Sequence, residues 1–251
     1  MRGFIITGTS RGLGQALAEQ ALREGGAVHG IARNRNEQLE RSAGHAEGVL
    51  THHVADLNEV ARIPQLAGEI VRGLESRQLE ELVLINNAGV LDPIGPVAEL
   101  EPGLLHRHIT VNVTALMQLT GAVLAQTHGA AYRRTVVNIS SGAAANPYYG
   151  WAPYCTAKAA VEMFTRVLAV EYEGDRSLRV LSVAPGVVDT DMQARIRKTD
   201  ERRFPHRPKF VHLKESGKLY TTEHAAELVL RAAGDEHIES GQSVDVRAHY
   251  G

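Results

Sequence analysis

Short, continuous apolar runs alternate along this chain with longer segments of helical periodicity, and no other feature constrains the fold as strongly. The apolar runs predict strands at residues 4–7, 27–32, 49–54, 82–86, 135–140, 178–184 and 243–246. The helical pattern recurs at residues 13–24, 59–74, 104–126, 152–172 and 224–233, and Pro64 is an unfavourable interior residue in the second of these. Strands separated by helices predict right-handed crossovers, and fully apolar strands predict a sheet covered on both faces. We therefore expect an α/β fold, a doubly wound parallel (Rossmann-type) sheet of about seven strands, with residues 1–251 forming a single domain.

The composition narrows the class of protein. The 251 residues are 43% hydrophobic, which is ample for a buried core, and the formal net charge of −2 gives no support for a nucleic-acid partner. Cys155 is the one cysteine, so we expect no intrachain disulfide and no cysteine-based metal site. The first apolar run is too short for a secretion signal, and no apolar run approaches the ~20 residues of a membrane span. These features predict a cytoplasmic protein with no membrane partner.

Residues 193–219 form the one stretch without a regular pattern. It is rich in basic residues, at 195–198, 202–203 and 207–209. It follows the sixth predicted strand, and ligands of doubly wound sheets bind outside the carboxyl ends of the strands. We therefore predict that residues 190–219 form a flexible lid over a ligand site, with a solvated excursion as the alternative.

A glycine-rich loop, TGTSRGLG at residues 7–14, separates the first strand from the first helix. Gly8, Gly12 and Gly14 allow a tight turn and a close approach of the backbone to a pyrophosphate, which the start of the helix then favours. The spacing departs from G-x-G-x-x-G, and no lysine follows as in a Walker loop. The strand before the loop and the helix after it still favour a dinucleotide site.

The end of the second strand predicts which dinucleotide binds. An acidic residue there would bind the free 2′-hydroxyl of NAD, whereas a cation would accept the 2′-phosphate of NADP. Position 32 is Ala32 and the next residue is Arg33, while Arg11 in the glycine loop adds a second cation. Guanidinium groups match phosphate oxygens in pairs. The charges favour NADP(H), and the alternative is that Arg33 is an ordinary solvated residue.

The segment YCTAK at residues 154–158 places Tyr154 and Lys158 one helical turn apart, so they share a face. A nearby ammonium stabilises a phenolate and lowers the phenol pKa from its ordinary ~10, which would make Tyr154 a proton donor. A surface pair is the alternative interpretation of this motif taken alone.

Several motifs in order resemble the short-chain dehydrogenase/reductase family. These are the glycine loop, NNAG at residues 86–89, Asn112, Ser141, and Tyr154 with Lys158. The resemblance covers essentially the full length. The segments at 140–158, 184–193 and 240–245 are similar to the sepiapterin reductase and bacterial benzil reductase branch of the family.

The resemblance implies a mechanism in which a hydride attacks a carbonyl carbon. Tyr154 would protonate the carbonyl oxygen, Ser141 would orient it, and Lys158 would lower the Tyr154 pKa and hold the nicotinamide ribose. Asn112 would hold a water in a proton relay behind Lys158. Because Ser141 and the nucleotide loop are also present, we favour the interpretation of Tyr154 and Lys158 as catalytic residues over their interpretation as a surface pair.

The resemblance also implies the residues that line the cofactor. These are Gly8, Ser10, Arg11, Gly12, Leu13, Gly14, Arg33, Asp56, Leu57, Asn87, Ala88, Gly89, Tyr154, Lys158, Pro185, Gly186, Val188 and Thr190. Asp56 would meet the adenine amino group, with capping of the next helix as the alternative. Asn87 is also a candidate for a role in sheet structure.

For the substrate, the resemblance implies Ser141 and an acidic anchor at Asp245, for which a solvated carboxylate is the alternative. Tyr149, Trp151 and Met192 are candidate pocket walls or simple packing residues. His52, His53, His106 and His108 lack metal-ligand spacing, so we expect no metal site. Cys155 points away from Tyr154 around the helix and is expected in the core or at an interface.

The resulting prediction is an NADPH-dependent carbonyl reductase acting on a small-molecule ketone or diketone. The alternatives are an NADP-dependent secondary-alcohol dehydrogenase and a non-catalytic NADP-sensing module. The intact Ser141, Tyr154 and Lys158 argue against the latter. The helices at 104–126 and 152–172 carry more apolar residues than one core face requires, and family members pair these helices between subunits. A homodimer or homotetramer is therefore expected.

Overall fold

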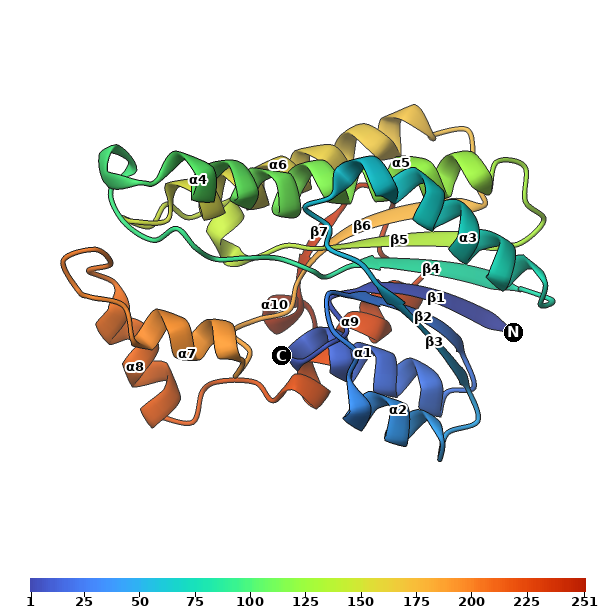
Figure 1. Ribbon diagram of the computed structural model, residues 1–251, viewed down its shortest axis with the longest axis horizontal. Coiled ribbons are helices and arrows are strands. Elements are labelled where there is room, and N and C mark those ends of the chain that lie inside the picture. The colour runs from blue at the N-terminus through green and yellow to red at the C-terminus, as the bar shows by residue number, and fades with distance from the viewer.

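The computed structural model describes all residues, Met1–Gly251, and contains one parallel sheet with helices on both faces (Figure 1). The strands are β1 (Arg2–Thr7), β2 (Ala27–Ala32), β3 (Val49–Val54), β4 (Glu81–Asn86), β5 (Arg133–Ile139), β6 (Leu178–Ala184) and β7 (Ser243–Asp245). Their order across the seven-stranded sheet is β3-β2-β1-β4-β5-β6-β7, and every pairing is parallel. The predicted doubly wound sheet is confirmed.

Two hydrophobic cores lie on opposite faces of the sheet. Helices α1 (Gly12–Arg23), α2 (Glu37–Ala43) and α9 (Thr222–Gly234) cover one face, and their apolar stripes pack on residues such as Phe4, Val83 and Leu181. Helices α3 (Ile63–Glu75), α5 (Ala115–Gln126) and α6 (Ala152–Glu171) cover the other, around Ile5 and Leu84. Strands buried on both faces explain why the sequence shows continuous apolar runs.

The chain reverses its direction of winding between β1 and β4, which are neighbours in the sheet. From β1 it winds outward to β3, and from β4 it winds the other way to β7. Such a switch point leaves a crevice outside the carboxyl ends of the two strands. The glycine loop follows β1 and residues 87–89 follow β4, so both predicted cofactor motifs lie at this crevice.

The predicted helices and strands need four corrections. Pro64 lies in the first turn of α3, after a 3₁₀ turn (Val60–Arg62), where its missing N–H costs no hydrogen bond. The expected helix 104–126 is α4 (Pro102–Ile109), a π-helical turn (Thr110–Thr114) and α5. Helix α2 was not predicted, because its seven residues bury only Leu39. Val246 begins α10 (Val246–Tyr250) and does not extend β7.

The expectation that residues 193–219 are irregular is also wrong. The segment contains α7 (Asp191–Arg197) and α8 (Arg207–Glu215). Each helix buries very few apolar side chains, chiefly Ile196 in α7 and Phe210 in α8. A single anchor per helix produces no periodic apolar stripe, which explains why the sequence pattern did not reveal them.

The stretch Pro102–Gln126 contains an 18-residue window with a mean hydropathy of 1.3, which is long and apolar enough by composition alone to cross a membrane. One such helix is weak evidence for a membrane span, because a buried core helix passes the same test. More than half of this stretch is buried inside the protein, and Leu119 and Val123 pack in the core shared with α3. Its apolar character is that of a core helix in a doubly wound fold.

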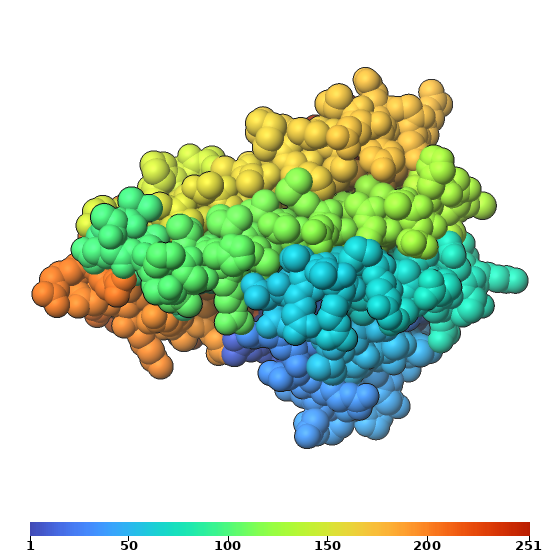
Figure 2. All heavy atoms as spheres, turned by 45° about the horizontal axis from the view of Figure 1, so that its top comes forward, coloured from blue at the N-terminus to red at the C-terminus, as the bar shows by residue number.

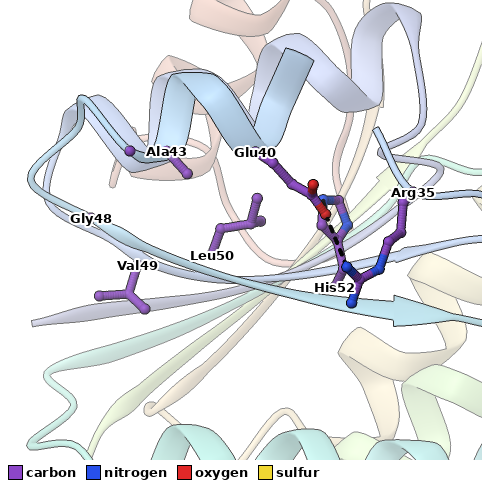
Figure 3. Close-up of a pocket in the computed structure, with 8 residues that line it drawn as sticks. Arg35, Glu40, Ala43, Gly48, Val49, Leu50 and His52 are labelled. Atoms are coloured by element: carbon purple, nitrogen blue, oxygen red, sulfur yellow. Dashed lines mark ion pairs between the residues drawn. The ribbon is translucent and has the colours of Figure 1, made fainter. Parts of the chain in front are cut away.

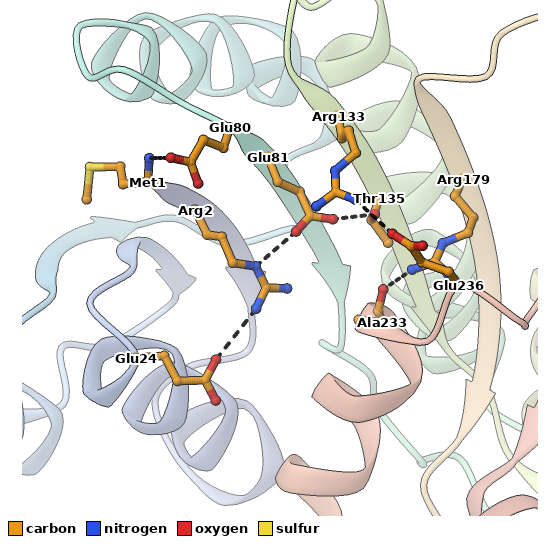
Figure 4. Close-up of polar contacts among 10 residues, drawn as sticks. All are labelled: Met1, Arg2, Glu24, Glu80, Glu81, Arg133, Thr135, Arg179, Ala233 and Glu236. Atoms are coloured by element: carbon orange, nitrogen blue, oxygen red, sulfur yellow. Dashed lines mark hydrogen bonds and ion pairs between the residues drawn. The ribbon is translucent and has the colours of Figure 1, made fainter.

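The amino ends of the strands carry a network of charged side chains (Figure 4). Arg2 Nε donates to Glu81 Oε2 at 2.9 Å, and Arg133 pairs with Glu236 at 3.0 Å. Glu81 is buried and also accepts a hydrogen bond from Thr135. This network surrounds a hollow of about 440 Å³. It lies at the edge of the sheet opposite the switch-point crevice, so it ties strand ends together far from the predicted site.

Candidate active site

The glycine loop is packed so closely that side chains are excluded at two of its three glycines. A Cβ on Gly14 would lie 2.2 Å from the carbonyl oxygen of Gly8, and a Cβ on Gly8 would lie 2.9 Å from Asn87 Nδ2. Gly8 and Gly12 have φ values of +79° and +58°, which glycine adopts most easily. The glycines therefore let the loop turn tightly against residues 87 and 88, which is the close backbone turn that a dinucleotide site uses.

Residues 87 and 88 are fixed to the end of β1. The backbone N–H groups of Asn87 and Ala88 both donate to Thr7 Oγ1 at 2.9 Å, and Asn87 Nδ2 donates to the Thr7 carbonyl at 2.8 Å. The Asn87 side chain thus has the structural role that the sequence analysis considered. Through these bonds the two cofactor motifs form one rigid unit at the switch point.

Asn36, the residue before α2, joins this unit and was missed from the sequence. Its Oδ1 caps α2 by accepting from Leu39 N. Its Nδ2 donates to Gln15 Oε1 at 2.8 Å and to the Ser10 carbonyl at 3.1 Å. A polar residue just before a helix signals a cap, but its contact with the glycine loop depends on the tertiary fold. Asn36 holds the loop against the segment that carries Arg33.

The two predicted cations differ in their surroundings. Arg33 is exposed and forms no ion pair. Arg11 pairs with Asp191 at 3.0 Å, and both side chains are largely exposed. This pair connects the glycine loop to the start of α7. Asp56 follows β3 and accepts from Asn58 N at 2.9 Å, so its carboxylate stabilises a local turn.

Ser141, Tyr154 and Lys158 meet at the carboxyl end of β5. Tyr154 and Lys158 lie on one face of α6, are both buried, and the Lys158 Nζ lies 5.7 Å from the centre of the Tyr154 ring. Lys158 Nζ donates to the carbonyl of Ile139 at 2.7 Å. The Ser141 hydroxyl lies close enough to the Tyr154 phenol to act on its pKa. The predicted triad is thus brought together within one buried cluster.

The pKa of Tyr154 is shifted opposite to the prediction from helical spacing. Burial raises the pKa of the Tyr154 phenol, and the contact with Ser141 only partly opposes this. Burial also lowers the pKa of Lys158 to about 8. The ammonium is directed at the Ile139 carbonyl, so its contact with the phenol is indirect. The structure therefore holds Tyr154 in its protonated form, the form required of a proton donor.

Asn112 lies in the π-helical turn, and its side chain is occupied. Its Oδ1 accepts from Val90 N, and its Nδ2 donates to the Val90 carbonyl, each at 2.8 Å. Nδ2 also lies 2.8 Å from His108 Nε2, while His108 Nδ1 lies 3.0 Å from the Asp92 carbonyl. An amide N–H donates, so His108 Nε2 accepts and Nδ1 carries the proton. The sequence analysis weighed His108 only as a metal ligand. Its position one helical turn before Asn112 is the sequence feature that indicates a contact between the two side chains.

An aromatic cluster covers the catalytic residues on the side of α7 and α8. Trp151 stacks on Phe204 with ring centres 4.5 Å apart and meets Tyr154 edge to face at 5.4 Å. Phe210 from α8 and Met192 from α7 pack in the same cluster. The indole N–H of Trp151 is buried and has no hydrogen-bond partner in the protein. Cys155 packs against this cluster and directs its thiol to the Asn146 carbonyl.

Two other expected substrate residues, Tyr149 and Asp245, do not have the predicted surroundings. Tyr149 is 53% exposed and does not join the cluster, whereas its neighbour Tyr148 packs against Trp151 with ring centres 5.1 Å apart. Tyr149 as a pocket wall is therefore not what this structure shows. Asp245 caps α10 and forms a two-pronged ion pair with Arg247, so its carboxylate is not a free anchor.

The segment after β6 completes the site. Gly186, which follows Pro185, has a φ of +82°, and a Cβ there would lie 3.1 Å from the Tyr220 ring. Val188 pairs with Tyr220 in an isolated bridge. Thr190 Cγ2 lies 3.4 Å from the position of a Cβ on Gly12, which brings the start of the predicted lid next to the glycine loop.

A second hollow, of about 380 Å³, lies between α2 and the edge strand β3 (Figure 3). It is lined by Arg35, Glu40 and His52 among others, and Arg35 pairs with Glu40 at 3.6 Å. None of the predicted site residues lines it. No group of three or more His, Cys, Asp or Glu side chains is arranged to hold a metal ion.

Comparison with known proteins agrees with this geometry. The sequence model of the short chain dehydrogenase family matches residues 3–201. The chain belongs to this family, as the motifs predicted, and is an oxidoreductase that acts on C=O or CH–OH groups. One solved neighbour, which is 28% identical to this chain and superposes with a TM-score of 0.81, contains bound NADP.

Within the family, the chain is similar to two kinds of reductase. It is 37% identical to the benzil reductase ((S)-benzoin forming) of Bacillus cereus over 247 residues, covering 98% of this chain and 99% of the relative. It is 35% identical to the sepiapterin reductase of Meriones unguiculatus over 252 residues, covering 96% of this chain and 94% of the relative. The crystal structure of the KRED1-Pglu enzyme superposes with a TM-score of 0.82 at 30% identity, covering 97% of this chain and all of the other. The predicted branch is confirmed.

Proposed function

We propose that this enzyme is an NADPH-dependent carbonyl reductase for aromatic ketones and diketones, with Tyr154 as the proton donor. The cluster of half-buried Ser141 with buried Tyr154 and Lys158 carries this proposal. The similarity to benzil and sepiapterin reductases supports a flat, carbonyl-bearing substrate. Oxidation of a secondary alcohol by NADP⁺ uses the same residues in reverse and remains the alternative reaction.

The residues at the switch point fit a nicotinamide dinucleotide. A Cβ on Gly8 or Gly14 would clash with Asn87 or with the Gly8 carbonyl, so these glycines let the loop pack directly against Asn87 and Ala88. Ser10, Leu13, Gly89, Leu57 and Asp56 would line the adenosine part of the cofactor, and Pro185, Gly186, Val188 and Thr190 would line its nicotinamide part. Arg33 is the unpaired cation for a 2′-phosphate, because Arg11 is already held by Asp191. We therefore assign NADP(H) in preference to NAD(H).

The chemistry divides between the cofactor and the protein. When bound, the reduced nicotinamide supplies the hydride that the carbonyl carbon accepts. Ser141 donates a hydrogen bond to the carbonyl oxygen, and Tyr154 delivers the proton as negative charge develops there. Lys158 has a pKa of about 8, so it stays charged at neutral pH and favours the phenolate left on Tyr154. The Asn112 side chain is hydrogen-bonded to the backbone of Val90 and so positions the segment after β4 behind Lys158. The proposed relay water would therefore bind to the backbone of Asn112.

The segment at residues 190–219 is proposed as the lid of this site. Phe204, Phe210 and Ile196 pack it onto Trp151 and Tyr154, next to the reacting carbonyl. Flat apolar walls with few polar groups suit an aromatic ketone. Met192 lies in the same wall and would contact the substrate.

We also propose that the enzyme is a homodimer or homotetramer. Several large apolar side chains are exposed on α5 and α6, which lie side by side on one face of the molecule (Figure 2). They are Met117, Met163, Val167 and Val170, with exposed fractions of 44%, 52%, 43% and 74%. Large contiguous apolar patches mark interaction surfaces in most proteins.

The decisive experiment follows the loss of NADPH absorbance with benzil, sepiapterin and simple diketones. The same panel is repeated with NADH and with Tyr154→Phe. Turnover with NADPH that disappears in Tyr154→Phe would support both the activity and the role of the tyrosine. Binding of NADPH without turnover on any ketone would contradict the reductase and favour the NADP-sensing module.

A further inference from the structure

An ion pair at the carboxyl end of β7 faces the loop that carries Ser141. Arg247 Nε donates to Asp245 Oδ1 at 3.0 Å and Arg247 Nη2 donates to Asp245 Oδ2 at 2.5 Å. Asp245 Oδ1 also accepts from the backbone N–H of Arg247 at 3.0 Å, which caps α10. Both carboxylate oxygens are thus in use, and the paired charges cancel locally. Figure 1 shows α10 next to the carboxyl end of β7, on the side of the crevice.

The Arg247 side chain extends from α10 over the catalytic loops. Its Cδ lies 3.3 Å from the position of a Cβ on Gly186, and its Nη2 lies 4.0 Å from that of a Cβ on Gly142. Gly142 directly follows Ser141, whose hydroxyl lies close to the Tyr154 phenol and would bind the carbonyl oxygen that is reduced. The guanidinium therefore lies beside the residue next to Ser141, at the edge of the proposed substrate site. A side chain at position 186 would crowd the stem of Arg247, and the glycine there leaves room for it.

Arg247 retains unused hydrogen-bond donors. A guanidinium has five N–H groups, and Asp245 takes one from Nε and one from Nη2. Asp245 is the only acidic side chain paired with Arg247. The other groups close enough to act on its charge are the phenols of Tyr148 and Tyr220. The remaining donors, including both N–H groups of Nη1, are free to bind an acceptor oxygen.

We propose that Arg247 is a specificity-determining residue that selects 1,2-dicarbonyl substrates by binding the second carbonyl oxygen. This inference rests on the proposed reductase function. Ser141 and Tyr154 bind the oxygen that is reduced, and the guanidinium beside Gly142 donates to the neighbouring oxygen as a charge-assisted partner. The second oxygen withdraws electrons from the reacting carbon, and a cation bound to it increases that effect. A substrate that places N–H groups at this position would face the N–H donors of Arg247. The Asp245 carboxylate could not accept hydrogen bonds from those groups, because it is already paired with Arg247.

The test compares two ketones that differ in one carbonyl group. Benzil has two adjacent carbonyls, and deoxybenzoin has a methylene in place of one of them. For each ketone, kcat/KM of Arg247→Met is divided by that of the wild type, so that intrinsic reactivity cancels. We expect Arg247→Met to lose about 10- to 100-fold in kcat/KM with benzil, the usual range for one hydrogen bond to a charged group, and less than about threefold with deoxybenzoin.

Matched variants separate this effect from a loss of folding. Arg176→Met removes an exposed arginine at the far edge of the sheet, and both ratios should stay near one. Arg247→Lys keeps the charge and should recover part of the benzil activity. Asp245→Asn keeps a helix cap but releases the guanidinium, so its loss with benzil should be smaller than that of Arg247→Met.

Three outcomes would overturn the proposal. They are equal losses on the two ketones, no loss on benzil, and a greater loss in Asp245→Asn than in Arg247→Met. NADPH affinity, measured by its fluorescence, should be unchanged in every variant, and a parallel loss there would assign the effect to general misfolding. A wild-type enzyme inactive on both ketones would instead refute the proposed function, and this inference with it.

Discussion

The Lys158 ammonium donates a 2.7 Å hydrogen bond to the carbonyl oxygen of Ile139, the last residue of β5. This bond fixes the cation close to Ser141, which begins the next turn of the chain. It also explains how a lysine remains in a position that is only 7% exposed. Burial nevertheless disfavours the charge of this ammonium and lowers its pKa.

The buried lysine predicts a stability that rises with pH. Burial lowers the pKa of Lys158 from 10.5 to about 8 in the folded protein. Below a pH of about 8, Lys158 is protonated in both the folded and the unfolded state, and the folded state bears the full cost of the buried charge. Between about 8 and 10.5 the unfolded state binds a proton that the folded state has released, so stability increases with pH. The whole effect is about 3 kcal/mol, at 1.36 kcal/mol per pKa unit.

Lys158→Met removes this titration, and denaturant unfolding of both proteins across that range measures it. The wild type should gain about 2–3 kcal/mol relative to Lys158→Met as the pH rises from 8 to 10.5. The comparison cancels the titration of the other lysines and tyrosines. Parallel stability curves for the two proteins would show that Lys158 keeps its ordinary pKa.

Gly14→Ala tests the close packing of the glycine loop. The added Cβ would lie 2.2 Å from the Gly8 carbonyl oxygen and 2.5 Å from Asn87 Nδ2, so the loop must move. We expect a loss of about 1–3 kcal/mol in the free energy of unfolding, together with weaker NADPH binding. Gly174→Ala is the matched control, because no atom lies within 4 Å of its added Cβ. If Gly14→Ala is as stable as this control, the loop is more open than described.

Arg33→Ala should change cofactor preference. Arg33 is exposed and unpaired, so its loss should leave the fold intact while removing a charge-assisted partner of the 2′-phosphate. We expect KM for NADPH to rise about 10- to 100-fold, with that for NADH nearly unchanged. Arg35→Ala, which removes a neighbouring arginine already paired with Glu40, is the control. Equal losses with both cofactors would exclude a specific role at the 2′-phosphate.

His108 supports Asn112, and replacing it should weaken both stability and catalysis. His108→Phe keeps a ring but leaves Asn112 Nδ2 and the Asp92 carbonyl each without one partner. Such buried unpaired groups cost about 1–3 kcal/mol, measurable by urea unfolding. His106→Phe, on the exposed side of α4, should change stability by less than about 0.5 kcal/mol. If the two variants behave alike, the bond between His108 and Asn112 has no energetic role.

The elements that the sequence predicts well are those with strong local patterns. Strands buried on both faces appear as apolar runs, and the glycine loop and the Tyr154–Lys158 spacing are encoded within a few neighbouring residues. The position of these motifs at the carboxyl ends of strands then follows from the parallel topology. The positions of Ser141, Tyr154 and Lys158 and of the crevice can therefore be predicted from local patterns and topology together.

The features that escaped prediction depend on contacts between distant segments. Which of Tyr148 and Tyr149 packs inward is decided by the turn at Gly150, where a Cβ would lie 2.2 Å from the Arg203 carbonyl oxygen. Arg203 belongs to the segment between α7 and α8, whose helices have too few buried residues to show a pattern. Likewise, spacing predicted a lowered pKa for Tyr154, but burial, which depends on the whole fold, raises this pKa.

Val170→Asp tests the exposed apolar face of α6. Val170 is 74% exposed, and Met163 and Val167 lie on the same helix with exposed fractions of 52% and 43%. Burial of this face between subunits would remove these side chains from water, and a carboxylate there would be buried without a partner. We therefore expect Val170→Asp to shift the enzyme towards the monomer in light scattering at micromolar concentration. Val97→Asp is the control, because Val97 is 67% exposed but lies in a 3₁₀ turn that belongs to neither α5 nor α6. A wild type that is already monomeric would exclude the oligomer, and an unchanged mass for Val170→Asp would place the interface on another face.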